Sequence, residues 1–121
     1  MKTLYKITSL KTEKSTFSAE ITFNPAHPLF EGHFPGQPIV PGVVLVEVAA
    51  AVISQLTGHE LIVKEASVIK FIQVVDPQVH PLLLLEGSVI ESEDNYKADM
   101  VYSSEGMVFA KLKGIRLQAV K

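Results

Sequence analysis

Residues 40–58, VPGVVLVEVAAAVISQLTG, form the stretch that decides the fold. Pro41 lies near a plausible first helical turn and Gly58 closes the segment, which is the asymmetry typical of helix ends. The stretch therefore predicts a helix of roughly four turns. Because its residues are apolar almost all round, we expect it to be the core helix of the domain, enclosed by other structure.

Six short segments rich in β-branched and aromatic residues flank this helix and predict strands. One apolar helix is best buried by an antiparallel sheet that curls round it. We therefore predict an α+β protein with the hot-dog fold, a sheet of about six strands around one long central helix. The expected strands are Thr3–Leu10, Ser15–Phe23, Leu61–Val75, Leu82–Glu91, Tyr96–Ser103 and Met107–Val120, with turns at Lys11–Lys14, Asp94-Asn95 and Glu105-Gly106.

The segment Asn24–Pro41, which precedes the helix, holds five of the seven prolines and two glycines. This density predicts neither regular helix nor a central strand. Three large apolar side chains, Phe30, Phe34 and Ile39, need burial, so the segment is predicted to be an ordered loop.

The chain has 121 residues, of which 47% are hydrophobic and 20% charged, and is predicted to form a single domain over residues 1–121. A net charge of -2 argues against a nucleic-acid partner, and the lack of cysteine excludes thiolate chemistry. The sequence shows no signal peptide, and its apolar stretches are too short to span a membrane, so a cytoplasmic location is expected. One helix cannot cover a whole sheet, which predicts a homodimer or an oligomer of such dimers.

Two side chains near the start of the helix are candidates for acid/base chemistry. His33 lies in the proline-rich loop, and histidine readily moves protons near neutral pH. Glu47 lies about a turn and a half inside an apolar helix, where an ionised carboxyl is costly to bury without a partner. Its helix neighbours at i±3 and i±4 are all apolar, so a partner must come from elsewhere. The helix start, around Gly42 and Val43, offers free N–H groups for a carbonyl oxygen.

From the pattern alone, other roles remain open for these residues. His33 could be structural or merely exposed, and Glu47 could meet a structural partner in a subunit interface. The other histidines are expected to be structural, with His27 in the loop, His59 capping the helix end and His80 solvated in a turn. Their scatter along the sequence does not suggest a metal site.

The segment GHFPGQPIVPGVVLVE, residues 32–47, resembles the active-site signature of the bacterial (3R)-hydroxyacyl-[acyl carrier protein] dehydratases. In that family GHFPG is followed by PGV and then by an acidic residue in the helix. The resemblance covers roughly Asn24–Leu117. It implies elimination of water from a 3-hydroxyacyl thioester held by an acyl carrier protein, in fatty-acid or related lipid or polyene biosynthesis, without metal or organic cofactor.

The resemblance also implies roles for particular residues. His33 removes a C2 proton and Glu47 protonates the departing C3 hydroxyl, and in the family these two groups come from different subunits. The N–H of Gly42 binds the thioester oxygen, and the carbonyl of Ile39 orients the His33 ring. The acyl chain is expected to lie along Val43, Val46 and Ala50.

Several features depart from the family pattern. The glutamine usual in the helix is replaced by Ala51, the family's N-terminal helix has no counterpart, and DPQVH (76–80) stands where Pro-Gly-Asp is common. Two alternatives therefore stay in view, an acyl thioesterase in which Glu47 activates water and a non-catalytic acyl-binding module. Basic side chains that could dock an acidic carrier are Lys70, Lys111, Lys113 and Arg116.

Overall fold

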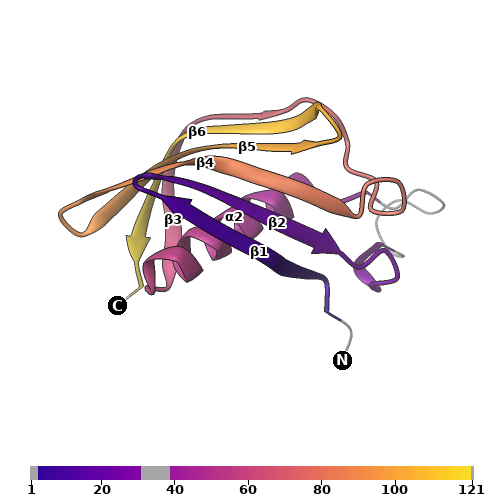
Figure 1. The fold of residues 1–121 in the computed structure, drawn as a ribbon, viewed down its shortest axis with the longest axis horizontal. Helices are drawn as coiled ribbons and strands as arrows, with labels where there is room; N and C mark the ends of the chain where they lie inside the picture. The colour runs from indigo at the N-terminus through magenta and orange to yellow at the C-terminus, as the bar shows by residue number, and fades with distance from the viewer. Residues whose placement is uncertain (1–2, 31–38, 121) are drawn as a thin grey trace.

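The computed structural model describes residues 3–30 and 39–120, and it shows one sheet curled around one helix (Figure 1). The strand order is β1-β2-β4-β5-β6-β3, and every neighbouring pair is antiparallel. The predicted α+β hot-dog arrangement is confirmed. The elements are β1 (Tyr5–Glu13), β2 (Thr16–Phe23), α2 (Gly42–Thr57), β3 (Leu61–Phe71), β4 (Leu82–Ser92), β5 (Asn95–Ser104) and β6 (Met107–Ala119).

Helix α2 lies under the concave face of the sheet, and its ends follow the predicted signals (Figure 1). Pro41 precedes the first turn, and Gly58 ends the helix in the left-handed conformation with φ 78°. The Gly58 N–H donates to the Ser54 carbonyl at 2.9 Å, which satisfies one carbonyl of the last turn. No helix in the described part of the chain is both long and apolar enough to cross a membrane.

The core lies between α2 and the inner face of the sheet. The helix buries one face, made of Leu45, Val48, Ala49, Val52 and Ile53. Alternate residues of the strands meet it, as expected when one face of an antiparallel sheet is buried. The buried strand residues include Ile21, Phe23, Leu83, Leu85, Tyr102, Phe109, Leu112 and Leu117.

Every strand differs from its predicted range at one end or both, and three of the differences have a clear cause. Strand β1 continues through Glu13 and turns at residues 14 and 15, because Glu13 still pairs with Thr16. The turn predicted at Asp94-Asn95 lies one residue earlier, since Asn95 pairs with Ser92. Strand β3 ends at Phe71 instead of Val75, because the chain then crosses to the start of the helix.

The crossing after β3 is held by backbone hydrogen bonds. The N–H groups of Ile72 and Gln73 both donate to the Phe109 carbonyl, at 2.8 and 3.2 Å, and the N–H of Val40 donates to the Val75 carbonyl at 2.9 Å. The segment before α2 is thereby anchored to the segment after β3. Residues far apart in sequence thus meet at the first turn of the helix.

The prediction of no helix in Asn24–Pro41 was wrong at Leu29 and Phe30, which are helical. Nδ1 of His27 accepts the Leu29 N–H at 3.0 Å, and this side-chain to backbone bond gives His27 the structural role expected of it. Phe30 is buried, as its size required. The predictions for His33 and Phe34 fall outside the described residues.

Gly87 on β4 offers a sharp test of the sheet. A methyl group on its Cα would approach the Asp99 carbonyl oxygen to 2.0 Å and the Met100 Cα to 2.9 Å, both backbone atoms that cannot move aside. Gly87→Ala is expected to lower the free energy of unfolding by about 3 kcal/mol or more. Chemical denaturation at one fixed protein concentration measures this loss.

The neighbouring Ser88→Ala supplies the control, because Ser88 is only half-buried and lies on the opposite face of the same strand. Its free energy of unfolding should stay within about 0.5 kcal/mol of the wild type. Equal unfolding midpoints for the two variants would contradict the close approach of β4 and β5.

Candidate active site

One face of α2 is not covered by the sheet, and the candidate site lies there. We call this the open face; it comprises Val43, Glu47, Ala50, Ala51 and Ser54, at helical spacing on the side opposite the buried residues. Val43 is 64% exposed, and Glu47 is also exposed. The expectation that other structure would enclose the whole helix was therefore wrong for the single chain. A curled sheet covers one side of a helix, and this helix is apolar on both.

The Glu47 carboxyl lines a cavity of about 460 Å³ between the open face and the start of β3. Apart from Glu47, Glu60 and Ser54, its walls are apolar. The Ser54 hydroxyl is engaged in structure, since it donates to the Ala50 carbonyl at 2.8 Å and accepts the Leu61 N–H at 3.0 Å. The lining residues are Val46, Glu47, Ala50, Ala51, Ser54, Glu60, Leu61, Ile62 and Val63. The cavity is of a size and character suited to an apolar ligand.

A second cavity, of about 620 Å³, lies at the N-terminus of α2 and is lined by residues that include Ile39, Gly42 and Val43. The N–H groups of Val44 and Leu45 donate to the Pro41 carbonyl, at 3.0 and 3.3 Å. Within the described residues the N–H of Gly42 has no such acceptor. A helix start with a free N–H favours negative charge, so this cavity can polarise a carbonyl oxygen.

The ring of Phe71 lies directly over Gly42. A methyl group at Gly42 would meet Cζ of Phe71 at 2.6 Å, so only glycine allows the ring this close. Phe71 is 53% exposed, and it therefore forms part of the outer wall of the second cavity. An apolar wall beside the Gly42 N–H lowers the local dielectric and strengthens its pull on a carbonyl.

The charge of Glu47 also acts on a tyrosine of β1. Burial raises the pKa of the Tyr5 phenol, and the nearby charge of Glu47 raises that pKa further. Tyr5 begins β1, and its ring centroid lies 6.2 Å from that of Phe23. The carboxyl of Glu47 is thus within electrostatic reach of the first strand as well as of β3.

The predicted site residues fall into two groups in the structure. Val46, Glu47 and Ala50 line the first cavity, while Ile39, Gly42 and Val43 line the second. His33 lies outside the described residues, between Phe30 and Ile39. Within residues 3–30 and 39–120, the predicted acid and the predicted carbonyl-binding N–H therefore line different cavities.

The remaining histidines have no part in either cavity. The ring centroid of His59 lies 6.4 Å from that of Tyr96, and the helix end is closed by the backbone of Gly58 and not by this side chain. The prediction that His80 is solvated was wrong, because its ring packs edge-on against Phe109 at 5.1 Å and its Nδ1 is buried. The turn that holds His80 folds back onto the core.

Sequence reasoning missed Phe71, which lines the second cavity, and the electrostatic link between Glu47 and Tyr5. Phe71 stands at the end of a strand, where only the close approach to Gly42 reveals its place. Tyr5 is separated from Glu47 by the first hairpin and by the segment before α2, and no spacing rule relates them. Across residues 3–30 and 39–120 no group of three or more side chains suited to a metal ion occurs.

Comparison with known proteins identifies the family. A family model described as ApeI-like, ApeI dehydratase, matches residues 9–113. The chain is 41% identical over 56 residues to the 3-hydroxyacyl-[acyl-carrier-protein] dehydratase FabZ of Dinoroseobacter shibae, covering 46% of this chain and 33% of that protein. It is 33% identical over 88 residues to the FabZ of Ehrlichia chaffeensis, covering 69% and 59% respectively. The chain thus spans less than two thirds of the length of these relatives.

A solved structure gives a similar answer for the fold. The chain superposes on a protein of the dehydratase heterocomplex ApeI:P from Xenorhabdus doucetiae with a TM-score of 0.74, at 20% identity, over 93% of this chain and 96% of that one. This likeness concerns the fold alone. The family model matches most of the sequence, including helix α2 and strand β3. This match shows that the chain belongs to the ApeI-like dehydratase family.

Proposed function

We propose that this protein is a (3R)-hydroxyacyl-[acyl carrier protein] dehydratase that converts a 3-hydroxyacyl thioester to the trans-2-enoyl thioester and water. The observation that carries the proposal is the Glu47 carboxyl over an apolar cavity, in a chain of a dehydratase family. The apolar walls suit an acyl chain, and the carboxyl is the one acid on the open face of α2.

In the proposed reaction, His33 takes a proton from C2. The electrons of the broken C2–H bond form the new double bond between C2 and C3. The C3–O bond breaks, and Glu47 gives its proton to the departing hydroxyl, which leaves as water. The N–H of Gly42 stabilises the negative charge that develops on the thioester oxygen. The reaction requires a protonated Glu47 and a neutral His33 at the start. It ends with Glu47 as a carboxylate and His33 as an imidazolium.

We further propose that the enzyme is a homodimer with its active sites shared between chains. Support comes from the division of the site residues between two cavities, one with Glu47 and one with Gly42 and Ile39. A dimer that packs the open face of α2 against a second copy can join the Glu47 cavity of one chain to the Gly42 cavity of the other. His33 is assigned to this shared site from the sequence motif alone.

The two edges of the sheet also favour a second copy at β3. Edge strand β1 carries exposed charged residues, which discourage further pairing, as Lys6, Lys11 and Glu13 do here. Edge strand β3 also carries exposed charges, but unlike β1 it exposes several large apolar side chains, Ile62, Val68 and Ile69. Large apolar groups on an unpaired edge favour pairing with another chain. Sedimentation of the purified chain as a dimer would support the homodimer, and sedimentation as a monomer would contradict it.

The acyl carrier protein is proposed to dock beside the second cavity. Lys70 on β3 and Lys111 on β6 are directly opposite each other, and Lys113 follows on the same face. Like charges directly opposite one another destabilise a sheet, and an acidic partner would remove this cost. Phe71 covers Gly42 from the inner face of the sheet, so Lys70 and the other two lysines lie behind this wall of the cavity, on the outer face.

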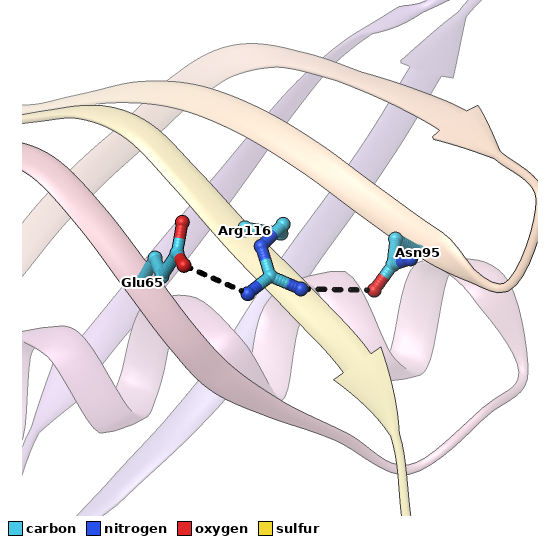
Figure 2. Close-up of polar contacts among 3 residues, drawn as sticks. All are labelled: Glu65, Asn95 and Arg116. Atoms are coloured by element: carbon cyan, nitrogen blue, oxygen red, sulfur yellow. Dashed lines mark hydrogen bonds and ion pairs between the residues drawn. The ribbon is translucent and has the colours of Figure 1, made fainter.

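Arg116, the fourth basic candidate, is already engaged (Figure 2). Its guanidinium lies 3.1 Å from the Glu65 carboxylate and donates to the Asn95 side-chain oxygen at 3.3 Å. Because Arg116 is tied to β3 and β5, it is a weaker candidate for a carrier contact than the three lysines.

Hydration of a crotonyl thioester, the reverse reaction, tests the activity directly. The wild type should form 3-hydroxybutyryl thioester, and His33→Ala and Glu47→Gln should each lower kcat by about 10²- to 10⁴-fold. His59→Ala and Glu86→Gln, which alter exposed groups away from the open face, are the matched controls and should retain wild-type kcat.

Two outcomes would reject the dehydratase proposal. Release of free thiol from a 3-hydroxyacyl thioester without any enoyl product would show an acyl thioesterase. Tight binding of acyl thioesters without turnover in either direction would show a non-catalytic acyl-binding protein.

Charge reversal tests the carrier surface. The double variant Lys70→Glu, Lys111→Glu is expected to raise KM for carrier-linked substrate about tenfold, because rim charges chiefly govern encounter, and to leave KM for a coenzyme A-linked substrate unchanged. The control Lys6→Glu, Lys11→Glu makes the same change in net charge on edge strand β1. An equal rise in KM for both pairs, or for both substrates, would argue against docking at Lys70 and Lys111.

A further inference from the structure

A buried hydrogen bond joins the middle of the sheet to the helix just before Glu47. The Tyr102 hydroxyl, on β5, donates to the Leu45 carbonyl of α2 at 2.6 Å. Tyr102 is fully buried, flanked in the sheet by Leu85 and Ala110. Burial raises the pKa of the Tyr102 phenol, so the hydroxyl stays protonated and remains a donor at any working pH.

The Leu45 carbonyl does not need this bond. In an α-helix the carbonyl of residue 45 accepts the N–H of Ala49, and both residues lie inside α2. Tyr102 therefore uses the second lone pair of an oxygen that is already satisfied. Phenylalanine would fill the same space without any buried polar group, so satisfying the helix does not explain the hydroxyl.

The hydroxyl restrains the orientation of α2, whereas the apolar contacts of the helix depend little on orientation. The helix is apolar on almost every face, so hydrophobic burial changes little when the helix rotates or slides. A hydrogen bond depends steeply on distance and angle. Buried polar groups can fix register among apolar surfaces in this way, at a cost in desolvation.

The two ends of α2 are tied differently. At the far end, the Ser54 hydroxyl accepts the Leu61 N–H at 3.0 Å and so fastens the helix to β3. This tie lies about 13 Å along the axis from Leu45. Among the described residues, the Tyr102 bond is the tie that links the first half of α2 to the centre of the sheet, and Gly42 and Glu47 both belong to that half.

We infer that Tyr102 is a positioning residue of the active site, whose hydroxyl sets the rotation and height of α2 so that Glu47 and the Gly42 N–H meet the substrate. The inference rests on the proposed dehydratase function for its catalytic consequence. Its structural part, the restraint of the first half of α2, stands on the hydrogen bond itself. A displacement of about 1 Å in a catalytic group is enough to lower kcat strongly.

The experiment compares Tyr102→Phe with Tyr96→Phe. Tyr96 lies on the same strand and the same inner face, nearly buried, and its hydroxyl reaches Glu91 at 3.5 Å instead of the helix. Each variant of the full chain is assayed with a coenzyme A-linked substrate, well below its melting temperature. Amide hydrogen exchange is followed along α2 in the same samples.

Tyr102→Phe is expected to lower kcat about tenfold, with KM within about twofold of wild type, and to speed exchange of the amides in residues 44–49. Tyr96→Phe should change neither quantity. A purely stabilising role for Tyr102 would lower the melting temperature and leave kcat intact. Wild-type kcat or unchanged exchange in Tyr102→Phe overturns the inference.

The two proposals fail separately. If the wild type itself shows no turnover, the dehydratase function is wrong, and hydrogen exchange alone then judges Tyr102. Faster exchange in the first half of α2, in Tyr102→Phe and not in Tyr96→Phe, supports the positioning role. Equal exchange in the two variants overturns it.

Discussion

A helix that is apolar on nearly all faces has to be covered on two sides, and one curled sheet covers only one. In this protein the sheet takes the face that holds Leu45, Val48 and Val52, and the face that holds Val43 and Glu47 stays open. Both cavities border this open face, one beside Glu47 and the other beside Val43 at the helix start. The apolar character of the helix also creates a need for polar ties, because apolar contacts alone leave the rotation of α2 poorly defined.

The fold could be predicted from sequence because its signals are local. Pro41 and Gly58 bracket α2, and alternating apolar residues mark the strands. The errors arose where long-range contacts override local pattern. Strand β3 stops at Phe71 although Ile72, Val74 and Val75 are good strand formers, because backbone bonds to Phe109 and Val40 redirect the chain. His80 is polar and lies between prolines, yet it packs against Phe109 because its turn folds back onto the core.

The candidate site was predictable only in part. Glu47 stood out because an acid inside an apolar helix demands an explanation, and the motif from Gly32 to Glu47 points to the family. The distribution of Val46, Glu47 and Ala50 in one cavity and Ile39, Gly42 and Val43 in another depends on the side of the helix that the sheet leaves free. Neither Phe71 over Gly42 nor Tyr102 on Leu45 follows from any spacing in the sequence, because both contacts join distant segments.

The central claim is that two copies of the chain build each active site, and mixing damaged subunits tests it most directly. His33→Ala and Glu47→Gln homodimers are unfolded together and refolded, so that about half of the dimers are mixed. If the two residues of a site come from different chains, each mixed dimer has one intact site and one doubly damaged site. Roughly a quarter of wild-type activity should then return. Activity that stays at the level of the separate variants, in a sample shown by mass to contain mixed dimers, would contradict the shared site.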